Sequence, residues 1–241
     1  MTRFPNLPSR CPPLVAMAVV SLWLSGCASQ PEQQAEADPT EAFTQLGMAY
    51  LERNNLPRAM SALNRALERA PNDPEALQAM AIVYQRQGER QQADETFQRA
   101  IAAAPNNSRA RNNYAVFLYE QGQVRRACEQ LEAASKDTRY ANRAQLFTNL
   151  GQCQWELGEI DQARHSLERA RSLEPRNPRS YFTLAELELE QGNPDRARQQ
   201  LEIFVGLAGM TPEAQALARQ IAANAPNMTV TPGSDNQRDA H

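Results

Sequence analysis

The chain has 241 residues, of which 41% are hydrophobic and 6% aromatic, and its formal net charge is −3. This length and apolar content can bury a continuous core without metal ions or a dense disulfide framework. Arginines interleaved with glutamates and aspartates lack the basic excess of a nucleic-acid binder, which argues against that class. Abundant Ala, Gln, Glu, Arg and Leu favour helix almost everywhere, so the composition predicts an all-α fold.

Residues 1–26 have the features of a targeting segment. Arg3 and Arg10 precede an apolar stretch, Leu14 to Leu24, that is too short to cross a membrane as an ordinary helix. The tetrapeptide ending at Cys27, Leu-Ser-Gly-Cys, resembles the bacterial lipobox. That resemblance implies a lipoprotein signal peptide, lipidation of Cys27 and a mature protein that begins there. An ordinary secretory signal with an incidental cysteine is the alternative.

The residues that follow Cys27 bear on the destination of the protein. Ala28, instead of Asp, follows the cysteine, and in proteobacterial lipoproteins this implies release to the outer membrane. Several acyl chains together anchor a protein firmly. Residues 27–39 are rich in Gln, Glu, Ala and Pro without apolar periodicity, which predicts a flexible tether. Removing Arg3 and Arg10 with the signal peptide changes the formal charge from −3 to −5.

Small and large apolar residues then recur with a spacing of 34 residues, counted from Thr40. The eighth position holds Gly47, Ala81, Ala115, Gly151 and Ala185. The twenty-fourth position holds Leu63, Phe97, Leu131, Leu167 and Leu201. Small residues recur where two helices cross closely, and this pattern is the tetratricopeptide (TPR) signature. We therefore predict a right-handed superhelical solenoid of five helix-turn-helix repeats with a C-terminal capping helix.

The repeat boundaries follow from the same register. The predicted TPR domain covers 40–225, with repeats at 40–73, 74–107, 108–141, 144–177 and 178–211, a capping helix at 212–225 and a disordered tail at 226–241. At the fifteenth position each repeat has a residue suited to a left-handed turn: Asn54, Gly88, Gly122, Gly158 and Gly192. The third repeat has Arg139 in place of the closing proline and is followed by an inserted Asn142 and Arg143. A longer connection into the fourth repeat is expected there.

Membership of such arrays implies that the first helices line an inner groove, with positions 2, 5, 9, 12 and 13 pointing into it. The candidate partner-binding residues are Met48, Leu51, Ile82, Gln85, Asn112, Asn113, Val116, Tyr119, Trp155, Phe182 and Leu189. Their apolar and amide side chains suit the binding of a peptide. For single residues, Met48 and Trp155 above all, packing between neighbouring helices is an equally simple interpretation.

Two cysteines remain after Cys11 is removed with the signal peptide and Cys27 is lipidated. Cys128 lies in the second helix of the third repeat and Cys153 in the first helix of the fourth, and these helices are neighbours in a stacked array. An oxidising compartment favours a Cys128–Cys153 disulfide. Two buried free thiols are the alternative.

Catalytic chemistry finds little support. His165 and His241 are the only histidines, and no metal cluster or catalytic triad can be built from them with familiar spacing. No glycine loop suited to phosphate is present. Glu186, Glu188 and Glu190 are interpreted as a solvated helix face. We therefore predict no enzyme activity, no cofactor, no metal and no small-molecule substrate.

The run from Asn112 to Gly122, NNYAVFLYEQG, resembles the type IV pilus biogenesis lipoproteins of the PilF/PilW family, as do Ala133–Thr138 and Asn149–Gly151. The resemblance covers about residues 20–210. It implies an outer-membrane lipoprotein, or pilotin, on the periplasmic face, which binds the pilus secretin subunit and promotes its localisation and multimerisation, or stabilises pili. After the fifth repeat the chain has one helix where some members carry a fuller sixth repeat. The alternative function is a periplasmic TPR lipoprotein that serves peptidoglycan hydrolases or the β-barrel assembly machinery as a scaffold.

Overall fold

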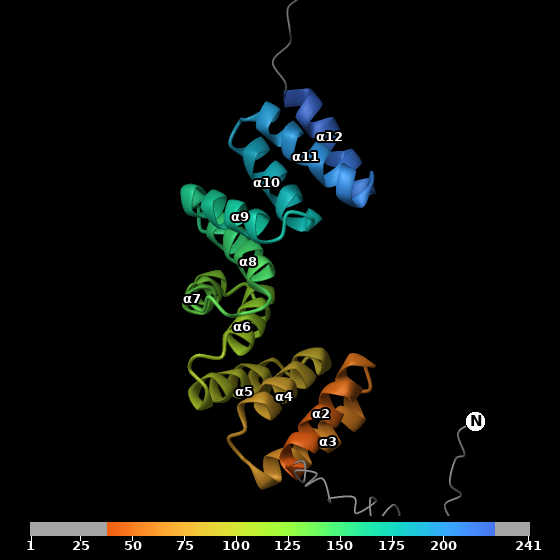
Figure 1. Cartoon of the computed structure of the whole chain (residues 1–241), viewed down its shortest axis with the longest axis vertical. Coiled ribbons are helices and arrows are strands. Elements are labelled where there is room, and N and C mark those ends of the chain that lie inside the picture. The colour runs from red at the N-terminus through yellow and green to blue at the C-terminus, as the bar shows by residue number, and fades with distance from the viewer. Residues whose placement is uncertain (1–37, 225–241) are drawn as a thin grey trace, which may run out of the picture.

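The computed structural model of the chain describes residues 38–224, and every regular element in that range is an α-helix. The helices are α2 (Pro39–Glu52), α3 (Leu56–Arg69), α4 (Pro74–Gln87), α5 (Arg90–Ala103), α6 (Ser108–Glu120), α7 (Val124–Ser135), α8 (Arg143–Glu156), α9 (Ile160–Leu173), α10 (Pro178–Glu190), α11 (Pro194–Ala208) and α12 (Pro212–Asn224). They form helix-turn-helix pairs stacked along one axis, from α2 and α3 at one end to α12 at the other (Figure 1). The predicted all-α TPR architecture is confirmed.

Local sequence determines where the helices begin. The side chains of Asp38, Asp73, Asn107 and Asn177 each accept a hydrogen bond from a backbone N–H of the first turn that follows. Such caps satisfy donors that have no partner within the helix. Most of these helices also have proline in the first turn, where the missing N–H costs nothing.

The turns inside the pairs have the left-handed conformation that the sequence predicts. The φ angles are 54° at Asn54, 81° at Gly88, 72° at Gly122, 77° at Gly158 and 74° at Gly192. Among the described residues, Asn54 is the only non-glycine with a positive φ. Asparagine tolerates this region better than most residues, so the first repeat forms its turn without glycine.

Close helix crossing explains the small residues at the eighth position. A Cβ atom on Gly47 would lie 2.5 Å from Cγ of Leu63, and one on Gly151 would lie 2.6 Å from Cγ of Leu167. Both distances are far below van der Waals contact, so the leucine of the second helix occupies the space beside each glycine. The two helices of these pairs are therefore locked together by complementary small and large side chains.

The largest core cluster lies in the middle of the chain and contains the rings of Phe97, Tyr114 and Phe117. The Tyr114 hydroxyl donates to Oδ1 of Asp94 at 2.7 Å and accepts from Nη2 of Arg126 at 2.5 Å. Burial, followed by the hydrogen bond to Asp94, raises the pKa of Tyr114 to about 12. This buried tyrosine links three successive helices, α5, α6 and α7.

An ion pair with a buried carboxylate connects the fourth repeat to the fifth. Nε of Arg164 on α9 lies 2.6 Å from Oε1 of Glu188 on α10, and the second carboxylate oxygen of Glu188 accepts from the side-chain amide of Asn193 at 2.9 Å. Glu188 is only 4% exposed. The expectation that this carboxylate lies on a solvated helix face is therefore wrong, because α9 covers it; Glu190 is exposed as expected.

The connection between α7 and α8 is the longest between repeats and covers residues 136–142, whereas its equivalents cover 70–73, 104–107 and 174–177. Oγ of Ser108 donates to Asp137 at 3.0 Å, and the backbone N–H of Arg139 donates to the other carboxylate oxygen at 2.9 Å. The hydrogen bond from Arg139 is the main cause of the lowered pKa of Asp137. The predicted change at the third repeat is thus a longer loop that is tied back to α6.

A disulfide between Cys128 and Cys153 joins the first part of α7 to the last part of α8, with Cα atoms 5.7 Å apart. The structure therefore has a geometry that permits the bond predicted from sequence; the redox state of these cysteines in the purified protein stays a prediction.

The last described helix, α12, packs on the fifth repeat. Ala214, Leu217 and Ile221 of α12 are buried against α11, and Arg219 and Gln220 point outward. Arg219 occupies the eighth position, where the five repeats have glycine or alanine for a closely packed second helix. A charged exposed residue there fits a capping helix.

The targeting segment lies outside the described residues. The predicted signal peptide, the lipidation site Cys27, all but the end of the tether and the tail 226–241 belong to the ranges 1–37 and 225–241. Among the helices of residues 38–224, none combines the length and the apolar character needed to cross a membrane.

Candidate protein-binding face

The first helices of the repeats, α2, α4, α6, α8 and α10, together form one surface, which we call the inner face. Direct contacts between successive first helices run along it. At the ninth position the partly exposed side chains change from Met48, Ile82 and Val116 to Gln152 and Glu186. Burial raises the pKa of Glu186. At this position the inner face is thus apolar over the first three repeats and polar in the last two, although Trp155, Phe182 and Leu189 keep the later repeats mixed in character.

Two of the predicted groove residues are buried. Leu51 is 6% exposed and belongs to the same core cluster as Met80 and Val83 of α4. It lies in the last turn of α2, where α4 covers it, and its carbonyl oxygen accepts from Nη1 of Arg86 at 2.8 Å. The prediction that Leu51 is available to a partner is therefore wrong, since its side chain stabilises the contact between the first two repeats.

Asn112 is 5% exposed, and its amide oxygen accepts from the side-chain amide of Asn149 at 3.2 Å. Position five of the repeat generally faces the next helix: Thr44, Gln78 and Thr148 occupy it and are also buried. The prediction that Asn112 faces a groove is corrected for this reason, because its amide group connects two repeats to each other.

The other predicted groove residues are partly exposed: Met48, Ile82, Gln85, Asn113, Val116, Tyr119, Trp155, Phe182 and Leu189. Several of them also pack on the core. Met48 and Ile82 contact the cluster of the first repeats, Trp155 contacts the cluster around Leu167, and the ring of Phe182 lies 5.0 Å from that of Phe204. Packing and exposure are therefore combined in the same side chains.

Polar side chains of the inner face are linked from repeat to repeat. Nε2 of Gln85 donates to Glu120 at 2.8 Å; the hydroxyl of Tyr119 donates to Glu156 and accepts from Nε2 of Gln152 at 3.1 Å. Burial, followed by the bond to Glu156, raises the pKa of Tyr119 to about 12. Tyr119 therefore offers a partner mainly its ring, since its hydroxyl already has two partners.

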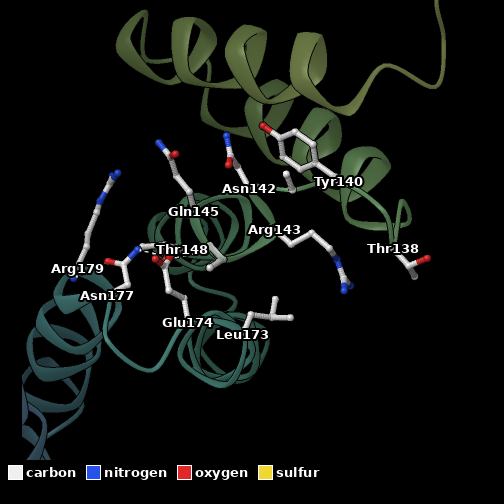
Figure 2. A pocket seen from close by; sticks show the side chains of 12 residues that line it. Thr138, Tyr140, Asn142, Arg143, Gln145, Thr148, Leu173, Glu174, Asn177 and Arg179 are labelled. Atoms are coloured by element: carbon white, nitrogen blue, oxygen red, sulfur yellow. Dashed lines mark hydrogen bonds between the residues drawn. The ribbon is translucent and has the colours of Figure 1, made fainter. Parts of the chain in front are cut away.

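The α7–α8 connection adds residues that the sequence analysis missed. Tyr140, Ala141 and Asn142 line two cavities, one of about 410 Å³ that also includes Met48 and one of about 700 Å³. Figure 2 shows the larger cavity, with Tyr140 and Asn142 on one side and Leu173 and Glu174 on the other. The insertion of Asn142 and Arg143 is the sequence signal at this place; it predicts a longer loop but not where the side chains of that loop lie.

Among residues 38–224, no three His, Cys, Asp or Glu side chains are grouped so that they could hold a metal ion. Arg143 and Arg179 both line the larger cavity. Figure 2 shows them at opposite ends of it and pointing apart, so they do not form one cluster of positive charge.

Family models of the tetratricopeptide repeat match residues 40–83, 84–150 and 154–221. The chain is also 31% identical over 210 residues to the type IV pilus assembly protein PilF of Pseudomonas aeruginosa, and this alignment covers 85% of the chain and 83% of that protein. The chain belongs to the PilF family. The family predicted from the NNYAVFLYEQG run is thereby confirmed.

Solved structures agree with this relationship. The structure of Pseudomonas aeruginosa PilF has a TM-score of 0.72 and 33% identity, covering 77% of this chain and 83% of its own. This chain also resembles PilW, described as a widely conserved type IV pilus biogenesis factor, with a TM-score of 0.72 and 22% identity, covering 78% of this chain and 86% of PilW. YrrB, described as a TPR protein with an unusual peptide-binding site, has a TM-score of 0.62, 18% identity and coverage of 73% and 90%. The similarities to PilW and YrrB show a shared fold only.

Proposed function

We propose that this protein is a non-catalytic assembly factor for type IV pili, which binds a secretin subunit through its inner face and helps secretin multimers to form. The observation that carries the proposal is the relationship to PilF, a type IV pilus assembly protein, over most of both chains. Stacked repeats present an extended surface, which suits the binding of a protein segment better than that of a small substrate.

The chemistry of the inner face supports a protein partner. Ile82 and Val116 provide a partly exposed apolar strip, and the Tyr119 ring lies beside it next to side-chain amides. An apolar strip bordered by amide and carboxylate groups can hold apolar side chains of a bound segment and its backbone hydrogen bonds at once. We infer that the secretin subunit uses such a segment.

The proposal includes a lipid anchor at Cys27, which places the protein on the periplasmic face of the outer membrane. The lipobox ending at Cys27 and the alanine that follows support this location. Cys27→Ser should abolish labelling with a fatty-acid probe and move the protein out of the membrane fraction. Persistent labelling together with outer-membrane fractionation of the variant would disprove the anchor.

Charged substitutions on the inner face test the binding surface. Ile82→Glu combined with Val116→Glu places two carboxylates on the apolar strip, at two positions that are only partly buried. The matched control is Ile203→Glu with Leu207→Glu, two exposed apolar residues of α11 outside the inner face. We expect the inner-face variant to retain helical content and anchoring but to lose SDS-resistant secretin multimers and surface pili, and the control to retain both.

A clean deletion of the gene tests the system itself. Normal secretin multimers and normal twitching motility in the deletion strain would refute the assignment to secretin assembly, and the envelope-scaffold alternative would then be preferred. Loss of multimers in both the inner-face and the control variant would refute the inner face as the binding surface, but the assignment to secretin assembly would stand.

A further inference from the structure

Three arginines of α3 lie over two aromatic rings of α2 at the end of the solenoid where the described chain begins (Figure 1). The guanidinium carbon of Arg58 is 5.7 Å from the centre of the Tyr50 ring, and those of Arg65 and Arg69 are each 5.6 Å from the centre of the Phe43 ring. All three arginines are exposed and both rings are partly exposed. Their charges are therefore accessible from solvent.

A large apolar side chain lies beside them. Leu46 is 44% exposed and is located three residues after Phe43 and four before Tyr50, so helical spacing puts the three on one side of α2. The other exposed large hydrophobics of the described chain belong to later repeats. We call this surface the end face; it consists of Phe43, Leu46, Tyr50, Arg58, Arg65 and Arg69.

Acidic residues of these two helices point elsewhere. Glu41 and Glu52 are two residues from Phe43 and Tyr50 respectively, which places them on the opposite side of α2. On α3, Glu68 is adjacent to Arg69 in sequence and projects about 100° away around the helix. The end face thus combines positive charge, aromatic rings and one exposed leucine.

We propose that the end face rests on the anionic phospholipid headgroups of the membrane that holds the lipid anchor. Guanidinium groups bind phosphate oxygens in a bidentate manner. Leucine and amphipathic aromatic rings partition into the headgroup region. The proposal rests on the lipid anchor of the proposed function and adds an orientation: the first repeat is the part of the domain that touches the bilayer.

The length of the preceding segment favours a membrane over an acidic protein as the occupant. Residues 28–38 separate Cys27 from α2, and a fully extended chain of this length spans at most about 40 Å. Once Cys27 is acylated, the start of α2 therefore lies within about 40 Å of the lipid headgroups. The formal charge of the mature chain, −5, opposes binding of the whole molecule to an anionic surface, so any attraction must come from a local face such as this one.

Vesicle sedimentation of the mature, non-lipidated chain, residues 27–241 with Cys27→Ser, tests the proposal. The vesicles contain either phosphatidylethanolamine with phosphatidylglycerol, or phosphatidylcholine alone. Each arginine near an anionic surface raises partitioning roughly fivefold at low salt. Arg58→Ser, Arg65→Ser and Arg69→Ser combined should therefore weaken binding to anionic vesicles about a hundredfold. Raising NaCl from about 50 to about 300 mM should also weaken binding of the parent chain.

The matched control removes the same charge elsewhere, with Arg125→Ser, Arg169→Ser and Arg196→Ser, all exposed residues of later repeats. It should change binding less than about threefold. The proposal is overturned if the parent chain does not bind anionic vesicles at low salt, or if both triple variants lose binding equally. Normal vesicle binding in the end-face triple, with loss of a secretin complex, would show that the surface contacts a protein instead. Because fatty-acid labelling of Cys27 is measured separately, failure here is distinguishable from failure of the anchor.

Discussion

Removal of the Cys128–Cys153 disulfide should loosen the middle of the solenoid more than its ends. The bond joins α7 to α8 across the longest connection between repeats, residues 136–142. Each repeat of a solenoid contacts only its neighbours, so the loss of one link between repeats is felt locally. The perturbation is either reduction of the parent chain or the double substitution Cys128→Ala with Cys153→Ala.

The sequence separation determines the magnitude. The two cysteines are 25 residues apart, and the chain-entropy model gives roughly 3.5 kcal/mol for closing a loop of that length. Both side chains are buried, so the alanine variant also leaves small cavities that add about 1 kcal/mol. Comparing the oxidised and the reduced parent chain avoids this packing term, because the side chains differ only in the bond and two hydrogens.

Amide hydrogen exchange with and without reductant is the assay. Reduction should lower the protection of α7 and α8 by up to about 3.5 kcal/mol, or about 300-fold in exchange rate, and leave α2 and α3 unchanged. Titration of free thiols in denatured, non-reduced protein is the control. Two reactive thiols in that titration, or equal protection of α7 and α8 in both redox states, would refute the reasoning.

Three further outcomes follow from side chains described above. Gly151→Ala should lower the free energy of unfolding by about 1 kcal/mol, because the added Cβ has no room beside Leu167. Gly206→Ala should raise the free energy of unfolding by up to about 1 kcal/mol, because nothing lies within 4 Å of the added Cβ and alanine favours helix. Urea titration of both variants measures the two changes. Glu188→Ala should lower the free energy of unfolding by about 2 kcal/mol, because it leaves Arg164 without its buried partner. Asp161→Ala removes a fully exposed carboxylate that pairs with the same arginine and should have no measurable effect; equal losses in the two variants would contradict this. The raised pKa of Tyr114 keeps its hydroxyl protonated in the folded state while the unfolded chain ionises from about pH 10, so stability should fall as pH rises from about 10 to about 12. Tyr114→Phe should reduce that fall, as thermal melts at several pH values will show.

The repeat architecture could be predicted from sequence because it depends on local rules that repeat five times. Gly151 beside Leu167 and the left-handed turn at Gly158 each follow from one residue in a known register. The turn at Asn54 follows in the same way. An ambiguous position in one repeat can be assigned from the equivalent positions in the other four, so the helix pairs and their turns could be predicted from the sequence.

Burial on the inner face was harder to predict, because it depends on how successive repeats cross. Leu51 and Asn112 occupy positions assigned to the groove, yet α4 covers the first and an amide from α8 meets the second. Glu188 shows the same limit, since its partner Arg164 comes from the preceding repeat. The cavity residues Tyr140 and Asn142 lie in a loop that is longer than its equivalents in the other repeats, so the register carries no information about where they point.

The central claim is that the inner face contacts a secretin subunit, and site-specific photocrosslinking in cells tests it most directly. A photoreactive amino acid placed at Ile82 or Val116, both partly exposed on that face, should give a crosslinked product that contains the secretin. The same amino acid at Ile203 on α11 should not. Secretin crosslinks from position 203 alone, or from none of the three positions in cells that assemble normal pili, would contradict the account.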